Sequence, residues 1–257
     1  MPHVLFVFAH QDDEIATATR ILHLLRGGWT ISCVFLTNGE GRRAKSNIRD
    51  EESRRVLARL GVDLARVHFA GSRARIPDGR LIDHFDRALA LLEEAAPETP
   101  DEVWTLAYEG GHQDHDAVHL IAVAYAARRG VPCFEVPLYH GYGLPGPFFN
   151  TLAPLRNGGA WTSRKIALAE GLHIALLCRF YTSQRKTWLG LLPEALLRLA
   201  LGRREWSRVA DLERIRDKPH DGTLFYERRF GVTWEEFAAK ARPFVAAIAR
   251  HLPPPRA

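Results

Sequence analysis

Short apolar runs alternate with longer segments of helical periodicity through the first half of the chain. Residues 3–9 are a continuous apolar run of the kind found in buried parallel strands, and residues 14–26 follow with helical spacing. The alternation continues, with strands expected over 30–37, 67–70, 102–107 and 133–138, and helices over 48–60, 84–96 and 114–129. This order predicts an α/β fold: a Rossmann-like, mostly parallel sheet with helices on both faces.

The alternation stops after Tyr139. Residues 141–160 are rich in Gly, Pro and Asn and predict a long loop, whereas residues 164–181 predict a helix. We therefore expect one domain over residues 1–257, with an α/β core in 1–140. Residues 141–257 would be a C-terminal extension that packs on the sheet and shapes the pocket.

Composition and charge narrow the class of protein. The 257 residues are 46% hydrophobic and 25% charged, which excludes a disordered or low-complexity chain. Thirty-five Lys and Arg against 30 Asp and Glu give a mild net charge of +5. This favours anionic ligands, but no dense basic block or reader motif accompanies it, so we expect no nucleic-acid partner.

The number of cysteines and the length of the apolar runs indicate where in the cell the protein is expected. Cys33, Cys133 and Cys178 are odd in number and far apart, so we expect no disulfides and a cytoplasmic protein. The apolar run at residues 4–9 is too short for a signal-peptide core and lacks a basic flank. No run of about 18 apolar residues is present, so no membrane span is expected.

One apolar segment of the second half has two possible interpretations. Residues 187–201 are strongly apolar and contain a proline. The basic residues at its end and behind it are Arg198, Arg203, Arg204, Arg208, Arg214, Arg216 and Lys218. Peripheral contact with anionic lipid is one interpretation. We favour a core-facing or homo-oligomer-facing helix, because residues 188–201 lack a lysine-lined polar face.

Two polar segments concentrate the chemistry. Residues 9–14 (AHQDDE) directly follow the first expected strand, and residues 109–116 (EGGHQDHD) directly follow the fourth. Ligands of open parallel sheets bind beyond the carboxyl ends of the strands. If strands one and four are neighbours, as in the common doubly wound order, these loops face one another.

The residue types of the two loops suit a catalytic zinc ion. Such an ion takes about three His or carboxylate ligands and keeps one position open. Two His and one Asp from these loops could supply that set, leaving a carboxylate as general base and a His to polarise a carbonyl. The first loop has no G-x-G-x-x-G, which counts against a dinucleotide site.

The two loops also carry a family resemblance. AHQDDE resembles the AHPDDE motif, and HQDH the HPDH motif, of the PIG-L/LmbE-like zinc-dependent N-deacetylases. This family includes N-acetylglucosaminyl-phosphatidylinositol, mycothiol-precursor and bacillithiol-precursor deacetylases. Further segments resemble the family's T-x-G-E, R-x-x-E, L-G-V, P-D-G and Y-x-S-Q patterns, at residues 37–40, 49–52, 60–62, 77–79 and 181–184.

The resemblance implies roles for individual residues. His10, Asp13 and His115 would ligate zinc, and Asp12 would be the general base. His112 would stabilise the tetrahedral oxyanion, with Asp114 holding its ring. Arg49 would bind the sugar or its substituent. Glu40 is a further candidate for substrate contact.

The chain departs from the family pattern at three places. Gln11 and Gln113 replace the usual prolines, from which we expect altered turn rigidity. Gly110 stands where one thiol-pathway relative has an active-site tyrosine. Tyr108, Tyr139 and His140 are the candidates by position for a replacement contact.

His119, one turn beyond His115, is an alternative metal ligand.

The predicted activity follows from the resemblance. We expect a zinc-dependent hydrolase that removes an N-acetyl group from an N-acetylglucosamine-type sugar or its small-molecule conjugate. An amidase or deacylase of a thiol conjugate or natural product is the alternative. A non-catalytic carbohydrate-binding module is the third hypothesis.

Overall fold

The structure is a computed structural model that describes residues 1–40, 46–156, 159–185, 190, 193–195, 204–211 and 213–249. The strands are β1 (His3–Phe8), β2 (Thr30–Phe35), β3 (Val67–His68), β4 (Glu102–Leu106), β5 (Cys133–Val136), β6 (Tyr139–His140), β7 (Asn150–Thr151), β8 (Thr162–Lys165) and β9 (Arg204–Val209). The helices are α1 (Glu14–Arg26), α2 (Ser46–Leu60), α3 (Ala70–Ala74), α4 (Phe85–Ala95), α5 (Gln113–Arg129), α6 (Leu168–Leu177), α8 (Phe225–Phe230) and α9 (Trp234–Ala249).

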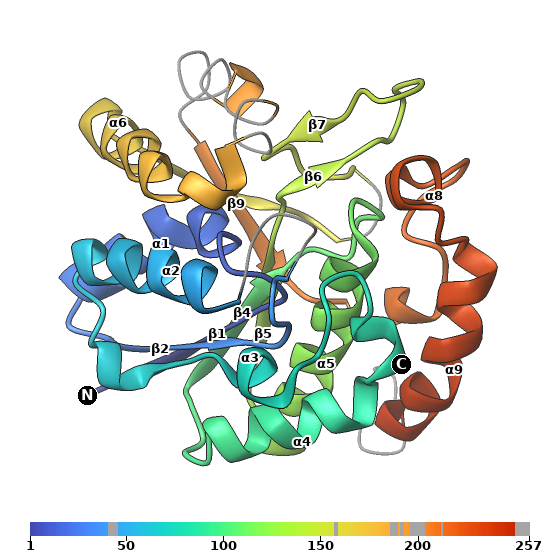
Figure 1. The fold of residues 1–257 in the computed structure, drawn as a ribbon, viewed down its shortest axis with the longest axis horizontal. Coiled ribbons are helices and arrows are strands. Elements are labelled where there is room, and N and C mark those ends of the chain that lie inside the picture. The colour runs from blue at the N-terminus through green and yellow to red at the C-terminus, as the bar shows by residue number, and fades with distance from the viewer. Residues whose placement is uncertain are drawn as a thin grey trace.

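Among the described residues, seven strands form one sheet in the order β3-β2-β1-β4-β5-β9-β8. Figure 1 labels β2, β1, β4, β5 and β9 of this sheet. The five strands from β1 to β5 are parallel, and β9 and β8 continue the sheet in antiparallel pairing. β1 pairs directly with β4, so the loops that follow these two strands leave the sheet at the same edge. The predicted mostly parallel α/β sheet is confirmed.

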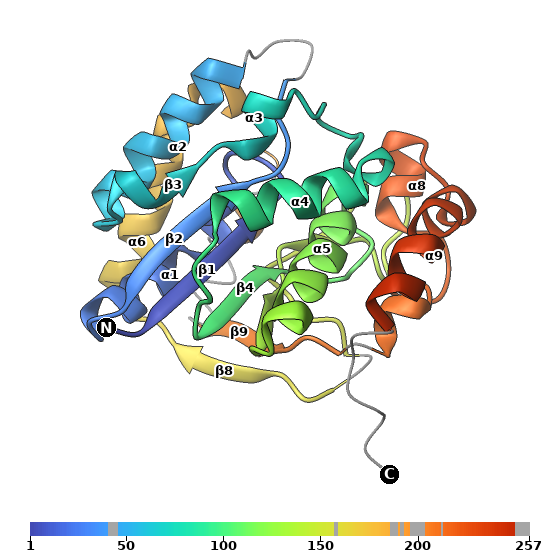
Figure 2. The same cartoon turned by 90° about the horizontal axis from the view of Figure 1, so that it is seen from below.

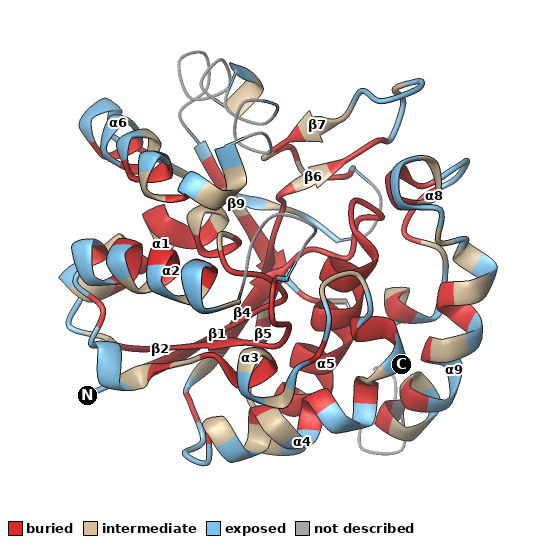
Figure 3. Cartoon of the chain, viewed as in Figure 1, coloured by how far each residue is buried: buried red, intermediate tan, exposed pale blue. Residues whose placement is uncertain are grey.

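Alternate side chains of β1 define two cores. Val4, Phe6 and Phe8 pack with residues of α1, α2 and α6, whereas Leu5 and Val7 pack with residues of α3, α4, α5 and α9. Figure 2 shows α3, α4 and α5 on the near side of the sheet and α1 and α6 behind it. Burial on both faces explains why the strand has no polar alternation. Figure 3 shows this buried centre in red.

The third expected strand is shorter than the sequence pattern indicates. Only Val67 and His68 pair with β2, and Ala70 begins helix α3. Gly71 explains the change of direction, because a Cβ at this position would lie 2.2 Å from the backbone carbon of Leu36. The missing side chain lets this short helix rest directly on the end of β2.

The extension differs from the sequence prediction at its start. The first two residues of the expected helix 164–181 belong to strand β8, and α6 begins only at Leu168. The expected loop 141–160 contributes β7, which pairs with β6. The predicted apolar helix 187–201 lies outside the described residues except at 190 and 193–195.

Two further expectations can be placed. All three cysteines are buried and free, with no disulfide among them. Within the described ranges, no helix is both long and apolar enough to span a bilayer. Of the basic residues, Arg198 and Arg203 lie outside the described part, whereas Arg204 and Arg208 lie on β9.

Candidate active site

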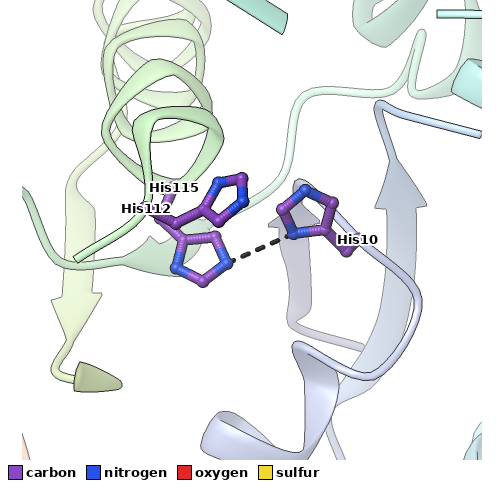
Figure 4. A group of neighbouring side chains, drawn as sticks. All are labelled: His10, His112 and His115. Atoms are coloured by element: carbon purple, nitrogen blue, oxygen red, sulfur yellow. Dashed lines mark hydrogen bonds between the residues drawn. The ribbon is translucent and has the colours of Figure 1, made fainter. Parts of the chain in front are cut away.

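The two polar loops meet at the carboxyl ends of β1 and β4. Figure 4 shows His10 from the first loop facing His112 and His115 from the second, with all three rings converging on one space. The Nδ1 atom of His10 lies 3.2 Å from Nε2 of His115, although 105 residues separate them in the chain. Adjacent parallel strands therefore create the site.

His10, Asp13 and His115 bring candidate ligand atoms close together, and Asp13 faces each histidine with a different oxygen. His10 Nδ1 and His115 Nε2 are 3.2 Å apart, His115 Nε2 and Asp13 Oδ1 are 3.1 Å apart, and His10 Nδ1 and Asp13 Oδ2 are 3.6 Å apart. A tetrahedral zinc ion with bonds of about 2.0–2.1 Å separates its ligand atoms by about 3.3 Å. The donor set and its spacing therefore fit a zinc ion.

Two other groupings of metal-binding side chains overlap this one. His10, His112 and His115 have ligand atoms within 4.8 Å of one another, and so do His10, Asp78 and Asp114. His112 is the N-cap of α5, and its Nδ1 accepts the backbone N–H of Asp114 at 3.1 Å. That bond leaves only Nε2 of His112 for any other role.

Carboxylates surround the remote nitrogen of His10. Its Nε2 lies 3.1 Å from Oδ2 of Asp114 and 3.1 Å from Oδ1 of Asp78. Asp114 is in turn fixed by the backbone N–H groups of Gly79 at 2.6 Å and Leu81 at 3.0 Å. A carboxylate behind a ligating imidazole orients the ring and raises its basicity. The sequence resemblance implies that the Asp114 side chain holds the His112 ring. In the structure the Asp114 carboxylate instead contacts the His10 ring, and His112 binds only the backbone N–H of Asp114.

Asp12 has an unusual backbone conformation. Its φ is +113°, in a region that side-chain-bearing residues rarely adopt. The backbone N–H of Asp12 donates to Glu14 Oε2 at 2.8 Å, and its Oδ1 accepts from Arg49 Nη2 at 3.0 Å. Burial raises the pKa of Asp12 to about 7, although the Arg49 guanidinium opposes this rise. The carboxyl group is therefore poised to exchange a proton near neutral pH.

Arg49 is committed to the protein itself. It is buried, and it donates to the carbonyl oxygens of Gly39 at 2.8 Å and Gln11 at 2.6 Å. It also bridges Asp12 and Asp78, whose carboxylates lie 3.0 and 3.2 Å away. Arg49 thus bridges two carboxylates at the wall of the site, and its contact with a sugar stays a prediction.

The electrostatics of the site favour a cation. Burial alone would raise the pKa of Asp13, but His115 and His10 hold that pKa well below its ordinary value. Burial alone would lower the pKa of His10, but Asp78, Asp114 and Asp13 hold it well above its ordinary value. In contrast, burial together with His10 and His115 lowers the pKa of His112, which keeps this ring neutral. Clustered carboxylates around His10 stabilise a positive charge at this point.

A cavity of about 220 Å³ opens above these groups. Its lining residues are His10, Asp12, Asp13, Arg49, Asp78, His112, His115, Leu138, Tyr139, Gln184 and Phe230. The Tyr139 ring centroid lies 5.3 Å from that of His115, and the Phe230 ring centroid lies 4.4 Å from that of His112. Core and extension therefore both contribute to the wall of the cavity.

Two predicted substrate residues do not line this cavity. Glu40 is exposed, and its Oε1 accepts the backbone N–H of Ser46 at 3.2 Å. His140 is buried with Nε2 at 3.0 Å from the carbonyl oxygen of Ala153. β6 explains the difference between His140 and Tyr139, because successive side chains of a strand point to opposite faces.

Two other candidates from the sequence also lie outside the cavity wall. His119 Nδ1 is 2.9 Å from the carbonyl oxygen of Leu106, and His119 is absent from the cavity wall, so it is not placed as a metal ligand. The Tyr108 hydroxyl donates to the carbonyl oxygen of Asp217. Of the three side chains considered as substitutes for a tyrosine at Gly110, only Tyr139 reaches the cavity.

Gln11 provides the turn with contacts that a proline lacks. Its amide nitrogen donates to Asp50 Oδ1 at 2.6 Å and to Ser72 Oγ at 3.2 Å. Gln113 similarly donates to the carbonyl oxygen of Gly79 at 3.2 Å. Hydrogen bonds thus hold both turns where the family motif has a rigid ring.

Besides Leu138, three residues of the cavity wall have no role that the sequence pattern predicts. Asp78 lies in a Pro-Asp-Gly segment that is typical of a turn, and Gln184 ends the Y-x-S-Q segment. Their similarity to family segments is the available signal for both. Phe230 has no signal, because its position depends on the packing of α8.

Comparison with known families identifies the core. Residues 5–126 match the PIG-L family, described as GlcNAc-PI de-N-acetylase. This segment contains both polar loops, and the resemblance noted in their motifs is confirmed. No curated protein matches the chain.

Solved structures share the fold at low sequence identity. A deacetylase–bog complex from the teicoplanin biosynthesis pathway has a TM-score of 0.62 at 16% identity, covering 81% of this chain and 99% of that chain. The A40926 pseudoaglycone deacetylase Dbv21 has a TM-score of 0.60 at 18% identity, covering 79% and 95%. N,N'-diacetylchitobiose deacetylase from Pyrococcus horikoshii has a TM-score of 0.55 at 17% identity, covering 81% and 83%. Residues 5–126 thus match the PIG-L family, and the solved structures show that the chain shares their fold.

Proposed function

We propose that this protein is a metal-dependent N-deacetylase that removes the acetyl group from an N-acetylglucosamine-type sugar or its conjugate. One observation carries the proposal: candidate ligand atoms of His10, Asp13 and His115 lie 3.1–3.6 Å apart beside the Asp12 carboxyl group, in a segment that matches the PIG-L family. His10, Asp13 and His115 would hold the ion. When bound, a zinc ion supplies Lewis-acid polarisation of the scissile carbonyl and of the attacking water.

Asp12 is the proposed general base. It takes a proton from the attacking water and later delivers it to the leaving amine nitrogen. Arg49 fixes the orientation of the carboxylate through the 3.0 Å contact between Nη2 and Oδ1. The positive φ and the bond to Glu14 hold the backbone of Asp12 in the conformation that this orientation requires.

His112 is the proposed stabiliser of the oxyanion. Because its Nδ1 accepts the Asp114 N–H and its ring is neutral, the ring proton lies on Nε2. A donor in that place binds the negative charge that develops on the carbonyl oxygen as the carbonyl carbon is attacked. Asp114 and Asp78 would keep His10 oriented from behind.

The extension is proposed to select the substrate. Gln184 and Phe230 come from residues 141–257 and complete a cavity whose remaining wall belongs to residues 1–140. Glycopeptide and chitobiose deacetylases share the fold, so both N-acetyl glycosides and larger natural-product conjugates are candidate substrates.

The experiment combines metal analysis with acetate release from N-acetylglucosamine, diacetylchitobiose, a glycopeptide pseudoaglycone and a non-sugar N-acetyl amide. We expect about one zinc ion per chain and acetate release from at least one glycoside. Release from the amide alone would instead support the alternative amidase. Bound metal without any hydrolysis, or no metal at all, would support a binding module and contradict the proposal.

A further inference from the structure

The position of Tyr139 in the cavity has a specific structural cause. Tyr139 begins β6, just after the end of β5, and its ring contacts the rings of His115, Phe149 and Phe225. These contacts are made by the ring and not by the hydroxyl group. The direction in which the phenol points therefore also depends on the backbone at residues 138–139. The backbone there makes its own polar contacts with the second polar loop.

Glu109 binds that backbone with one carboxylate oxygen. Its Oε1 accepts the N–H of Leu138 at 2.8 Å and the N–H of Tyr139 at 2.8 Å. Two successive N–H groups directed at one oxygen fix the peptide plane between them, and with it the direction of the Tyr139 Cα–Cβ bond. Glu109 is only 2% exposed and does not line the cavity.

The second loop meets the same corner at Gly111. A Cβ at this position would lie 2.0 Å from the carbonyl oxygen of Tyr139, so the two backbones touch. Asp116 Oδ1 fixes the loop from inside, accepting the N–H groups of Glu109 at 3.0 Å and Gly110 at 3.1 Å. Helix α5, which carries His115, is thus connected through Glu109 to Tyr139.

A carboxyl group is a costly way to brace a loop. Glu109 Oε2 is buried and has no hydrogen-bond partner among the described residues. Burying a polar side chain that is only half satisfied costs free energy that a brace made by backbone groups alone would avoid. Glu109 lies directly behind two residues of the cavity wall, and a cost kept at such a place is typical of a group that serves the site.

We propose that Glu109 is a positioning residue for the deacetylation: it holds Tyr139 against His115 so that the phenol contacts the bound substrate. This inference rests on the proposed function. Glu109 does not touch the substrate, and it acts through Tyr139. A mere brace for the fold would instead affect stability without any dependence on the Tyr139 ring.

Two substitutions of Glu109 test whether the length of its side chain matters. Glu109→Asp keeps the carboxyl group but withdraws its oxygens by one methylene, whereas Glu109→Gln keeps an oxygen at the same reach. We expect kcat to fall on the order of tenfold to hundredfold for Glu109→Asp. Glu109→Gln should stay within about threefold of the parent, with zinc content unchanged in both. Equal losses in the two variants would overturn the inference.

A double-mutant cycle tests the route through Tyr139. In a Tyr139→Ala background, where no phenol remains to be positioned, Glu109→Asp should reduce kcat by less than about twofold further. The matched control is Tyr125→Phe, a buried tyrosine whose hydroxyl binds Ala96 O. In that background Glu109→Asp should keep its full effect. Additive losses with Tyr139→Ala would show that Glu109 acts elsewhere.

A measurement without turnover distinguishes this inference from the proposed function. Hydrogen exchange of the Leu138 and Tyr139 amides should accelerate in Glu109→Asp and remain slow in Glu109→Gln. If the parent protein releases no acetate from any substrate, the proposed function fails, whatever the exchange rates are. If the parent is active but these amides exchange equally in both variants, only the role of Glu109 fails.

Discussion

The two sides of the cavity are built in different ways. On the core side, His10, Asp12 and Arg49 are buried or nearly so, and each makes several polar contacts with other site residues. On the extension side, Phe230 is 43% exposed and packs on His112 by ring contact. The core side therefore has the order that bond-breaking chemistry requires, and the extension side has freedom to vary.

Physical cost explains the contrast. Four aspartates and Arg49 share a small volume, so each charge depends on its neighbours. The neutral ring of Phe230, on the extension side, does not depend on neighbouring charges. Core substitutions should therefore remove metal or turnover, whereas extension substitutions should change substrate affinity.

The largest effect is expected from His115→Ala. Removing one of three donors leaves His10 and Asp13 as the pair nearest to the ion, and two ligands bind zinc poorly. We expect loss of stoichiometric zinc and of detectable acetate release, measured by elemental analysis and an acetate assay. A variant with full zinc occupancy would contradict the ligand assignment.

Asp12→Asn should lose activity without losing metal. Asparagine tolerates a positive φ better than alanine does, so the turn at φ +113° should persist. Without a general base, kcat should fall about 10²- to 10⁴-fold at unchanged zinc content. Glu40→Gln is the control, because Glu40 is exposed and outside the cavity, and this variant should behave as the parent. Turnover at the parental rate in Asp12→Asn would exclude Asp12 as the base.

Asp114→Asn should weaken metal binding by a smaller amount. The amide oxygen can still accept one of the N–H groups of Gly79 and Leu81, which bind different oxygens of Asp114. The amide loses the other bond, and it no longer presents a negative charge to His10 Nε2. We expect a rise of about 10- to 100-fold in the zinc dissociation constant, the usual effect of removing such a carboxylate. Competition with a fluorescent chelator measures it. An unchanged constant would mean that Asp78 alone orients His10.

Strand order and loop placement explain how much of this site the sequence could predict. Buried parallel strands are recognisable as apolar runs, and polar residues at their ends gather at one edge when the strands are neighbours. His10, Asp13 and His115 lie together for that reason. Asp114 shows the limit, because its partner depends on which way a side chain turns at the start of α5.

Residues that the sequence pattern misses or misplaces owe their positions to tertiary contacts. His140 is adjacent to Tyr139 in sequence, yet the strand turns it away. Asp78 reaches His10 only because the segment after α3 crosses the edge of the sheet, where Asn38 receives the N–H of Asp78. Phe230 depends on how α8 packs, which no local periodicity encodes.

Phe230→Ala tests the extension side and should have the smallest effect. Loss of an aromatic contact is worth about threefold to tenfold in affinity, so KM should rise by that factor while kcat stays near the parental value. Phe148→Ala is the matched control, because Phe148 is 65% exposed and does not line the cavity. Steady-state kinetics on the best glycoside of the panel separates the two constants. If kcat falls and KM does not rise, the Phe230 ring acts on His112. The extension side would then contribute to the reaction itself, and the contrast between the two sides of the cavity would be wrong at Phe230.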